Sequence, residues 1–214
     1  MSKPATLGSL ALLLAAGAAH ASTSFTASLS NDQETGSVVP TTVSGASRPA
    51  SFGTATFVLN DAMNAMTFQA MVSNIDFTGS QTADLNDNLV AAHIHAGATA
   101  VPGSNGPVVW GFFGTPFNDN APNDVVVTPF ASGVGGTVTG KWDLLEGNNT
   151  TLKEQLPSIL AGRSYINFHT TQFPSGEVRG QIVAAVPEPG TYALMLGGLA
   201  VLGAVARRRA RRQR

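Results

Sequence analysis

The feature that most constrains the fold is a series of short runs bounded by Gly, Pro, Asn, Asp or Ser, many of which alternate apolar and polar residues. A period of two places the apolar side chains on one face of a β-strand and the polar side chains on the other. Eight such runs predict strands at residues 25–29, 53–60, 65–73, 90–96, 107–113, 137–143, 164–170 and 177–184. Short strands separated by turns are typical of an all-β fold, so we expect an antiparallel Greek-key β-sandwich-like single domain.

The segments between these runs predict how the strands are connected. Residues 60–64 (NDAMN) separate two alternating runs and suit the turn of a hairpin. The longest segments suit surface loops, and they are residues 38–51, 76–88 and 115–132.

One short segment has a helical pattern instead. Thr151 and Glu154 have the spacing of a capping box, and Gly162 can end a helix in a left-handed conformation. An apolar stripe is expected at Leu152, Leu156 and Leu160. Pro157 lies too deep for a single regular helix, so we expect two short turns, the second beginning at Pro157.

The N-terminus has the composition of an export signal. Lys3 precedes an apolar run over residues 7–19, and Ala19 and Ala21 flank His20 in the small-x-small pattern that signal peptidase recognises. We therefore expect residues 1–21 to form a signal helix that is removed, with Ser22 as the first mature residue.

The C-terminus combines three features in a fixed order. Pro187, Glu188 and Pro189 come first, an uncharged segment over residues 191–206 follows, and six of the last eight residues are arginine. The apolar part is shorter than the roughly 20 residues of a comfortable membrane span, and arginine after it favours a cytoplasmic tail. We expect a hydrophobic transmembrane helix within residues 187–214.

This order resembles the PEP-CTERM sorting signal of Gram-negative bacteria. The resemblance implies transient anchoring in the inner membrane, recognition by an exosortase and cleavage near Pro187–Pro189. The protein would then be released or attached at the cell surface or in the extracellular matrix. An ordinary tail anchor with a proline-rich hinge is the alternative.

The charge of the chain is distributed unevenly. Residues 22–186 hold five basic and twelve acidic side chains, a formal net charge of −7, whereas the whole chain is near neutral. An acidic domain excludes nucleic acid as an expected partner and favours cations, neutral polysaccharides or proteins. The chain has no cysteine, so neither disulfides nor thiolate chemistry contribute.

Three histidines remain after the signal segment, and alternation places them together. His93 and His95 flank Ile94, so both imidazoles lie on one face of a strand and Ile94 points into the core. His169 lies in the run at residues 164–170, on the same face as Tyr165 and Asn167 by the same alternation.

The next run extends this polar face. Residues 170–176 suit a hairpin loop, and alternation on the following strand places Glu177, Arg179 and Gln181 on its polar face. If Glu177 pairs with His169, then Arg179 faces Asn167 and Gln181 faces Tyr165.

Two interpretations of this face remain open. The imidazoles of His93, His95 and His169 could hold one Cu or Zn ion, with Glu177 as a fourth ligand or as a hydrogen-bond partner of His169. Alternatively, the histidines bond backbone carbonyls and Glu177, and Arg179 pairs with that carboxylate, in a purely structural network.

The same segments resemble the CHRD domain first noted in chordin. The resemblance rests on residues 91–97 (AAHIHAG), 105–109 (NGPVV), 160–170 (LAGRSYINFHT) and 174–181 (PSGEVRGQ), and upstream on 28–34 and 53–57. It spans about residues 25–183 and implies a β-sandwich-like extracellular domain of bacterial surface proteins and of an animal antagonist of secreted growth factors. The usual Glu-x-Pro-Pro stretch near Glu34 is replaced here by ETGSVVP.

These observations favour a non-enzymatic binding or structural module at the cell surface, processed by signal peptidase and exosortase. A mononuclear metalloprotein, with redox chemistry as one option, is the alternative. His-x-His with a distant third histidine is similar to the copper ligands of Cu/Zn superoxide dismutases, although this chain lacks their cysteine pair and remaining histidines. Paired-carboxylate chemistry by loop acids such as Asp84 and Asp87 is a third option.

Overall fold

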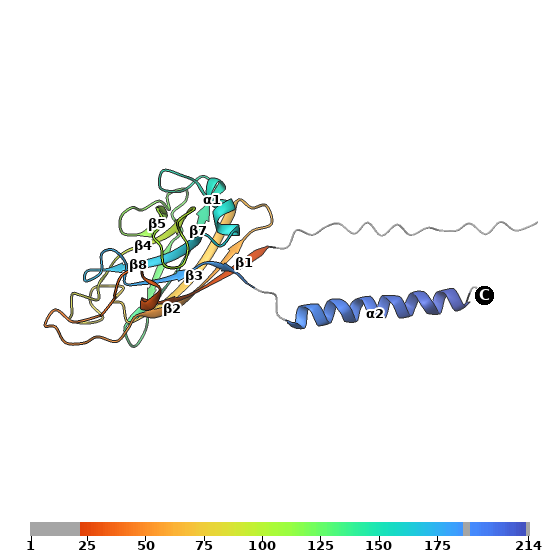
Figure 1. Cartoon of the computed structure of the whole chain (residues 1–214), viewed down its shortest axis with the longest axis horizontal. Helices are drawn as coiled ribbons and strands as arrows, with labels where there is room; N and C mark the ends of the chain where they lie inside the picture. Colours follow the sequence, from red (N-terminus) through yellow and green to blue (C-terminus); the bar gives the residue numbers. More distant parts are fainter. Residues whose placement is uncertain (1–21, 186–188, 213–214) are drawn as a thin grey trace, which may run out of the picture.

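The computed structural model of the chain describes residues 22–185 and 189–212. Its β-domain is built from ten strands, a 3-10 turn η1 (Asn31–Gln33) and one helix, α1 (Leu152–Leu160), shown in Figure 1. The strands are β1 (Thr23–Ser30), β2 (Phe52–Leu59), β3 (Ala65–Ser73), β4 (Leu89–Ala96), β5 (Val108–Phe113), β6 (Val126–Pro129), β7 (Gly135–Asp143), β8 (Ser164–Thr170), β9 (Val178–Gln181) and β10 (Val183–Ala184).

All strands belong to one antiparallel sheet that curls on itself. The order is β5-β4-β8-β9-β1-β2-β3-β7-β6, with β10 paired to β1. The Trp110 ring of β5, at one edge, stacks on Trp142 of β7, near the other edge, with ring centroids 5.6 Å apart. The two ends of the sheet therefore face each other across the core, which confirms the sandwich-like class.

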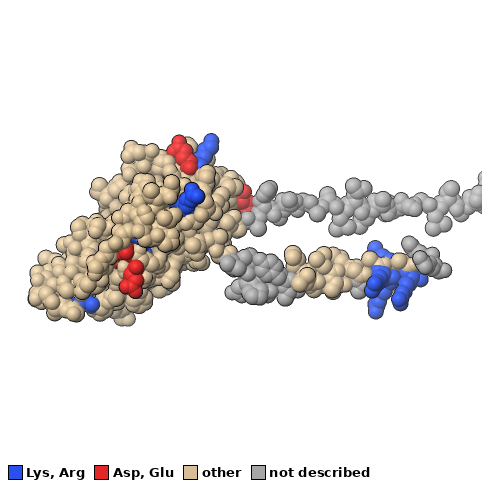
Figure 2. Space-filling model, in the orientation of Figure 1, with Lys and Arg blue, Asp and Glu red and all other residues tan. Residues whose placement is uncertain are grey.

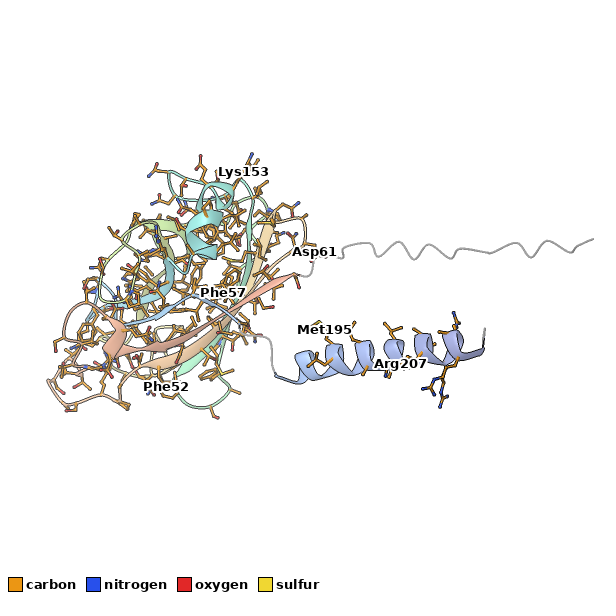
Figure 3. The ribbon with its side chains drawn as sticks, turned by 45° about the vertical axis from the view of Figure 1, so that its right-hand side comes forward. Phe52, Phe57, Asp61, Lys153, Met195 and Arg207 are labelled. Atoms are coloured by element: carbon orange, nitrogen blue, oxygen red, sulfur yellow. The ribbon has the colours of Figure 1, made fainter. Side chains whose placement is uncertain are left out.

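The core is formed by the apolar sets of the alternating strands. In β2 the buried positions are Ala55, Phe57 and Leu59, and the residues between them are exposed. Phe57 lies inside the domain, whereas Phe52 lies at its outer face (Figure 3). Burial of a large apolar side chain contributes about 1.5–3 kcal/mol, so the alternation determines which face turns inward.

The strand predictions hold with two differences. The connection at residues 115–132 contains the edge strand β6, which pairs with β7, although we expected only a loop. Its sequence VVTP does not alternate and ends in a proline, so it carries no period-two signal. The final run is divided into β9, which pairs with β8, and β10, which pairs with β1.

Helix α1 is one helix, and the expected division at Pro157 is wrong. Thr151 and Glu154 form a complete capping box, which stabilises the first turn. Pro157 is exposed, as is Lys153, whose carbonyl the missing N–H would have bonded. The buried stripe contains Leu152 and Ile159, with Leu156 partly buried, whereas Leu160 is exposed, contrary to expectation.

The two ends of the chain are described only in part. The predicted signal helix, with Ala19 and Ala21, lies outside the described residues, as do Pro187 and Glu188. Helix α2 (Pro189–Arg212) contains the apolar segment and ends in the arginine cluster seen in Figure 2. Within the described ranges, none of the helices is both long and apolar enough to cross a membrane.

Candidate functional site

The histidines are brought together by the pairing of β4 with β8. His93 lies opposite Asn167 and His95 opposite Tyr165, while Ile94 and Ile166 pair on the core side. In the β8–β9 pairing Asn167 is opposite Arg179 and Tyr165 opposite Gln181. The predicted register and shared face are both present.

The shared polar face is buried rather than open to solvent. His93, His95 and His169 are each 5–7% exposed, and Asn167 and Arg179 are 2–3% exposed. Three connections supply backbone contacts to this face: residues 97–107, 114–118 and 171–177. The face is therefore a second buried layer between the sheet and its loops.

The three imidazoles form a compact group, which we call the histidine cluster (His93, His95 and His169). One ring nitrogen from each lies within 4.8 Å of the other two. The closest pair is His93 Nδ1 and His169 Nε2, at 3.1 Å. Within the described residues this cluster is the one group of histidines and acids close enough to hold a metal ion.

One nitrogen of each imidazole is hydrogen-bonded to a backbone carbonyl. His93 Nε2 donates to the Thr115 carbonyl at 3.0 Å, and His169 Nδ1 donates to Pro174 at 3.0 Å. His95 Nδ1 donates to the Gly106 carbonyl at 2.9 Å. Each ring is thus fixed in orientation by a different loop.

Burial keeps the histidine cluster uncharged. It lowers the pKa of His95 to about 4, opposed by the Gly106 carbonyl. Burial, with the neighbouring His93, also lowers the pKa of His169 to about 4, and burial lowers the pKa of His93. At neutral pH the three rings are therefore neutral imidazoles, the form that binds metals.

Two glycines make room for the loops that supply these carbonyls. A methyl group on Gly111, which pairs with His93, would overlap the carbonyl of Pro116 and lie 3.2 Å from His93 Cδ2. A methyl group on Gly106 would lie 2.6 Å from Ala100 Cβ. A side chain at either position would displace the loop that orients a histidine.

Arg179 anchors two loops above β9. Its guanidinium donates to the Gln33 carbonyl and, at 3.1 Å each, to the Ser104 carbonyl and Asn105 Oδ1. It also lies over the Tyr165 ring, 4.7 Å from the centroid, and that ring stacks on His95 at 4.5 Å. The sequence pattern placed Arg179 on the correct face but did not identify these partners.

Glu177 belongs to a separate group, which we call the Glu177 cluster (Glu177, Arg48, Ser51 and Thr170). Arg48 donates to both carboxylate oxygens at 3.1–3.3 Å, and the Thr170 and Ser51 hydroxyls donate one bond each. Glu177 is fully buried. The proposed contact with His169 is wrong, because the carboxylate is turned to Arg48 and is not among the converging groups.

The expected pairing of Arg179 with Glu177 is also not formed. The acid nearest Arg179 is Glu34, at 4.0 Å, and the side chain of Glu34 is 5% exposed. Burial raises the pKa of Glu34 to about 7, against the attraction of Arg179. Glu34 lies in the stretch that departs from the usual family sequence, and no periodicity marked it as buried.

The loop acids contact residues of their own loop and of the neighbouring β1–β2 connection. Asp84 Oδ1 accepts a bond from the Val43 amide at 2.9 Å, and Asp84 Oδ2 lies 3.7 Å from Arg48. Asp87 accepts from the Thr82 hydroxyl at 3.0 Å. These contacts shape the loops, and burial, with Asp84 nearby, raises the pKa of Asp87.

Comparison with known proteins identifies both parts of the chain. Residues 25–182 match the family model described as the CHRD domain. Residues 185–212 match the model described as the PEP-CTERM protein-sorting motif. No curated protein and no solved structure matches the chain.

Proposed function

This chain belongs to the CHRD-domain family and carries a PEP-CTERM sorting motif, as its sequence indicated, and from this premise we propose that it is a non-enzymatic binding module displayed at the cell surface. The sorting motif supports export and exosortase-dependent sorting in a Gram-negative bacterium. Inner-membrane anchoring before sorting, and a polysaccharide or protein ligand afterwards, complete the proposal.

The observation that carries the proposal is that the charged side chains of the polar layer serve as loop anchors. Both oxygens of Glu177 accept hydrogen bonds, and a carboxylate without a free lone pair cannot serve as a general base. Arg179 is similarly engaged with the backbone of two loops. The loops are thus held in fixed conformations, which lowers the entropic cost of binding a ligand.

The charge of the domain supports an uncharged or cationic ligand. The mature domain is acidic, and its few charged side chains are scattered over the face seen in Figure 2. An anionic polymer would be repelled at low salt, whereas a neutral polysaccharide would not.

Sorting is tested in an exosortase-containing host with the full-length chain. We expect wild-type protein at the cell surface without its C-terminal segment, and Glu188→Ala protein retained, unprocessed, with the membrane fraction. Gly36→Ala, where a methyl group meets nothing within 4 Å, is the matched control and should be sorted normally. Equal processing of the Glu188→Ala variant would overturn the sorting step.

Binding without turnover is tested on the purified full-length chain with cell-surface polysaccharide, separated into neutral and anionic fractions. Co-sedimentation with the neutral fraction, without release of shorter products, is the expected result. Hydrolytic or redox turnover that disappears in a His169→Ala variant would overturn the non-enzymatic role.

A further inference from the structure

The hydrogen bonds of the histidine cluster determine where its protons lie. A carbonyl oxygen only accepts, so the ring nitrogen facing it must carry the hydrogen. The N–H groups are therefore on His93 Nε2, His95 Nδ1 and His169 Nδ1. A neutral imidazole has one N–H, so the remaining nitrogen of each ring carries a lone pair.

The lone-pair nitrogens of His93 and His169 converge directly, and the His95 ring belongs to the same group. His93 Nδ1 and His169 Nε2 face each other at 3.1 Å, a hydrogen-bond distance with no hydrogen available from either neutral ring. His95 Nε2 is buried and has no hydrogen-bond partner within the described part of the chain. A buried acceptor without a partner is unfavourable, so this arrangement calls for a positive group among the three nitrogens.

A shared proton is the simplest positive group, but the surroundings oppose it. The three side chains are only 5–7% exposed and no described carboxylate converges with them, so an imidazolium would be buried without a counter-charge. The carboxylate of Glu177, which could have stabilised an imidazolium, is bound to Arg48 instead.

We propose that the histidine cluster is a binding site for one transition-metal ion, Zn(II) or Cu(II), ligated by His93 Nδ1, His95 Nε2 and His169 Nε2. This inference goes beyond the proposed surface role. Two nitrogens at roughly 2.0–2.1 Å from one tetrahedral ion lie about 3.3 Å apart, close to the 3.1 Å between His93 and His169. Imidazole donors suit zinc and copper, whereas calcium and magnesium require oxygen ligands.

The carbonyls of Thr115, Gly106 and Pro174 have the role that outer hydrogen-bond partners have in metal sites. They hold the ring orientation and select the tautomer that leaves the correct nitrogen free. Three nitrogen donors leave a fourth coordination position to a small exogenous group, because no described acid converges with them. Metal binding would also link the loops that hold these carbonyls.

The direct test is metal titration of the purified full-length chain after chelator treatment. We expect one Zn(II) or Cu(II) per chain and a raised Tm, with no effect of Ca(II) or Mg(II). The electron paramagnetic resonance spectrum of the Cu(II) form should show coupling to three nitrogens. Absence of stoichiometric binding by both ions overturns the proposal.

Variants that each lack one of the proposed histidine ligands test which residues bind the ion. His93→Gln and His169→Gln should each weaken binding by more than about 100-fold, because even loss of an outer partner costs 10–100-fold. Lys141→Met, which removes a partly exposed cation outside the cluster, is the control and should bind like wild type. Unchanged affinity in both histidine variants overturns the site.

Nitrogen chemical shifts of the wild-type imidazoles test the proposal without a variant. In the metal-free protein at neutral pH we expect the Nε2–H tautomer for His93 and the Nδ1–H tautomer for His95 and His169. An imidazolium shared by His93 and His169 would overturn the proposal in favour of a proton. Metal addition should shift the three unprotonated nitrogens and leave the N–H nitrogens bonded to their carbonyls.

Discussion

The histidine cluster and the Glu177 cluster are both buried and both include residues of the β8–β9 hairpin, but they differ in the balance of hydrogen-bond donors and acceptors. Glu177 offers two oxygens, and Arg48, Ser51 and Thr170 supply donors to both of them. The histidines offer three buried lone-pair nitrogens, and neither of the neutral rings of His93 and His169 has a hydrogen to give the other. Burial alone therefore does not distinguish a structural network from a ligand site. Whether every buried acceptor has a hydrogen-bond donor does distinguish them.

The two clusters also hold different parts of the chain. The Glu177 cluster connects Arg48 and Ser51, from the β1–β2 connection, to the β8–β9 hairpin. The histidine cluster connects β4 and β8 to three loop carbonyls. Loss of the first should cost stability directly, and loss of the second should mainly cost ligand binding.

The largest expected effect is on the Glu177 cluster. Arg48→Met leaves the Glu177 carboxylate buried without its cation and should lower the free energy of unfolding by about 3–5 kcal/mol. Chemical denaturation measures the change. Lys141→Met breaks partly exposed ion pairs with Asp124 and Asp143 and should cost no more than about 1 kcal/mol. Similar losses in both variants would contradict the assignment of the Glu177 cluster as the structural one.

Gly111→Ala tests the link between a loop and the histidine cluster. The added methyl group overlaps the carbonyl of Pro116 and should displace the loop that presents Thr115 to His93. We expect a loss of about 2–3 kcal/mol in unfolding free energy and weaker metal binding. Gly36→Ala, which adds a methyl group in open space, should change neither. Full metal affinity in the Gly111→Ala variant would show that the Thr115 carbonyl does not orient the site.

The buried side chain of Glu34 predicts how the stability of the protein depends on pH. The folded pKa of Glu34, about 7, is above its unfolded value, so the folded state holds the proton more tightly. The stability that this provides is complete below about pH 4.5 and is lost as the pH rises through 7. The Glu34→Gln variant does not have this loss, so its free energy of unfolding relative to wild type should rise by up to about 3 kcal/mol between pH 4 and pH 8. The stability of the Gly36→Ala variant should follow that of wild type at every pH. If the stability of the Glu34→Gln variant changed with pH in parallel with that of wild type, the raised pKa of Glu34 would be refuted.

The sequence was sufficient to predict the sheet that carries both clusters. Alternation in β4, β8 and β9 fixes which side chains share a face, and a one-residue slip would turn Ile94 and Ile166 away from the core. This is why the three histidines were predicted to converge. It is also why the Asn167–Arg179 pairing was predicted correctly.

The loop contacts could not be predicted in the same way. Arg48 reaches Glu177 across 129 positions, from a segment without periodicity, and either Glu177 or Glu34 was a plausible partner for an arginine by sequence alone. The carbonyls that select the histidine tautomers are backbone atoms, which no residue type identifies. Gly106 and Gly111 were the available signals, because a glycine within or beside a strand often marks a close approach of another backbone.

The smallest expected effect on the free energy of unfolding is that of His169→Gln, and it contrasts the two clusters most directly. In the metal-free protein, His169→Gln removes one hydrogen bond to Pro174 but also removes a lone pair that faces His93 at 3.1 Å. The two changes oppose each other, so the free energy of unfolding should change by no more than about 1 kcal/mol. The same variant in saturating Zn(II) should lose the ligand-induced rise in Tm that wild type shows. A loss of about 3 kcal/mol without metal would instead place the histidine cluster with the Glu177 cluster, as a network whose hydrogen bonds already stabilise the metal-free fold.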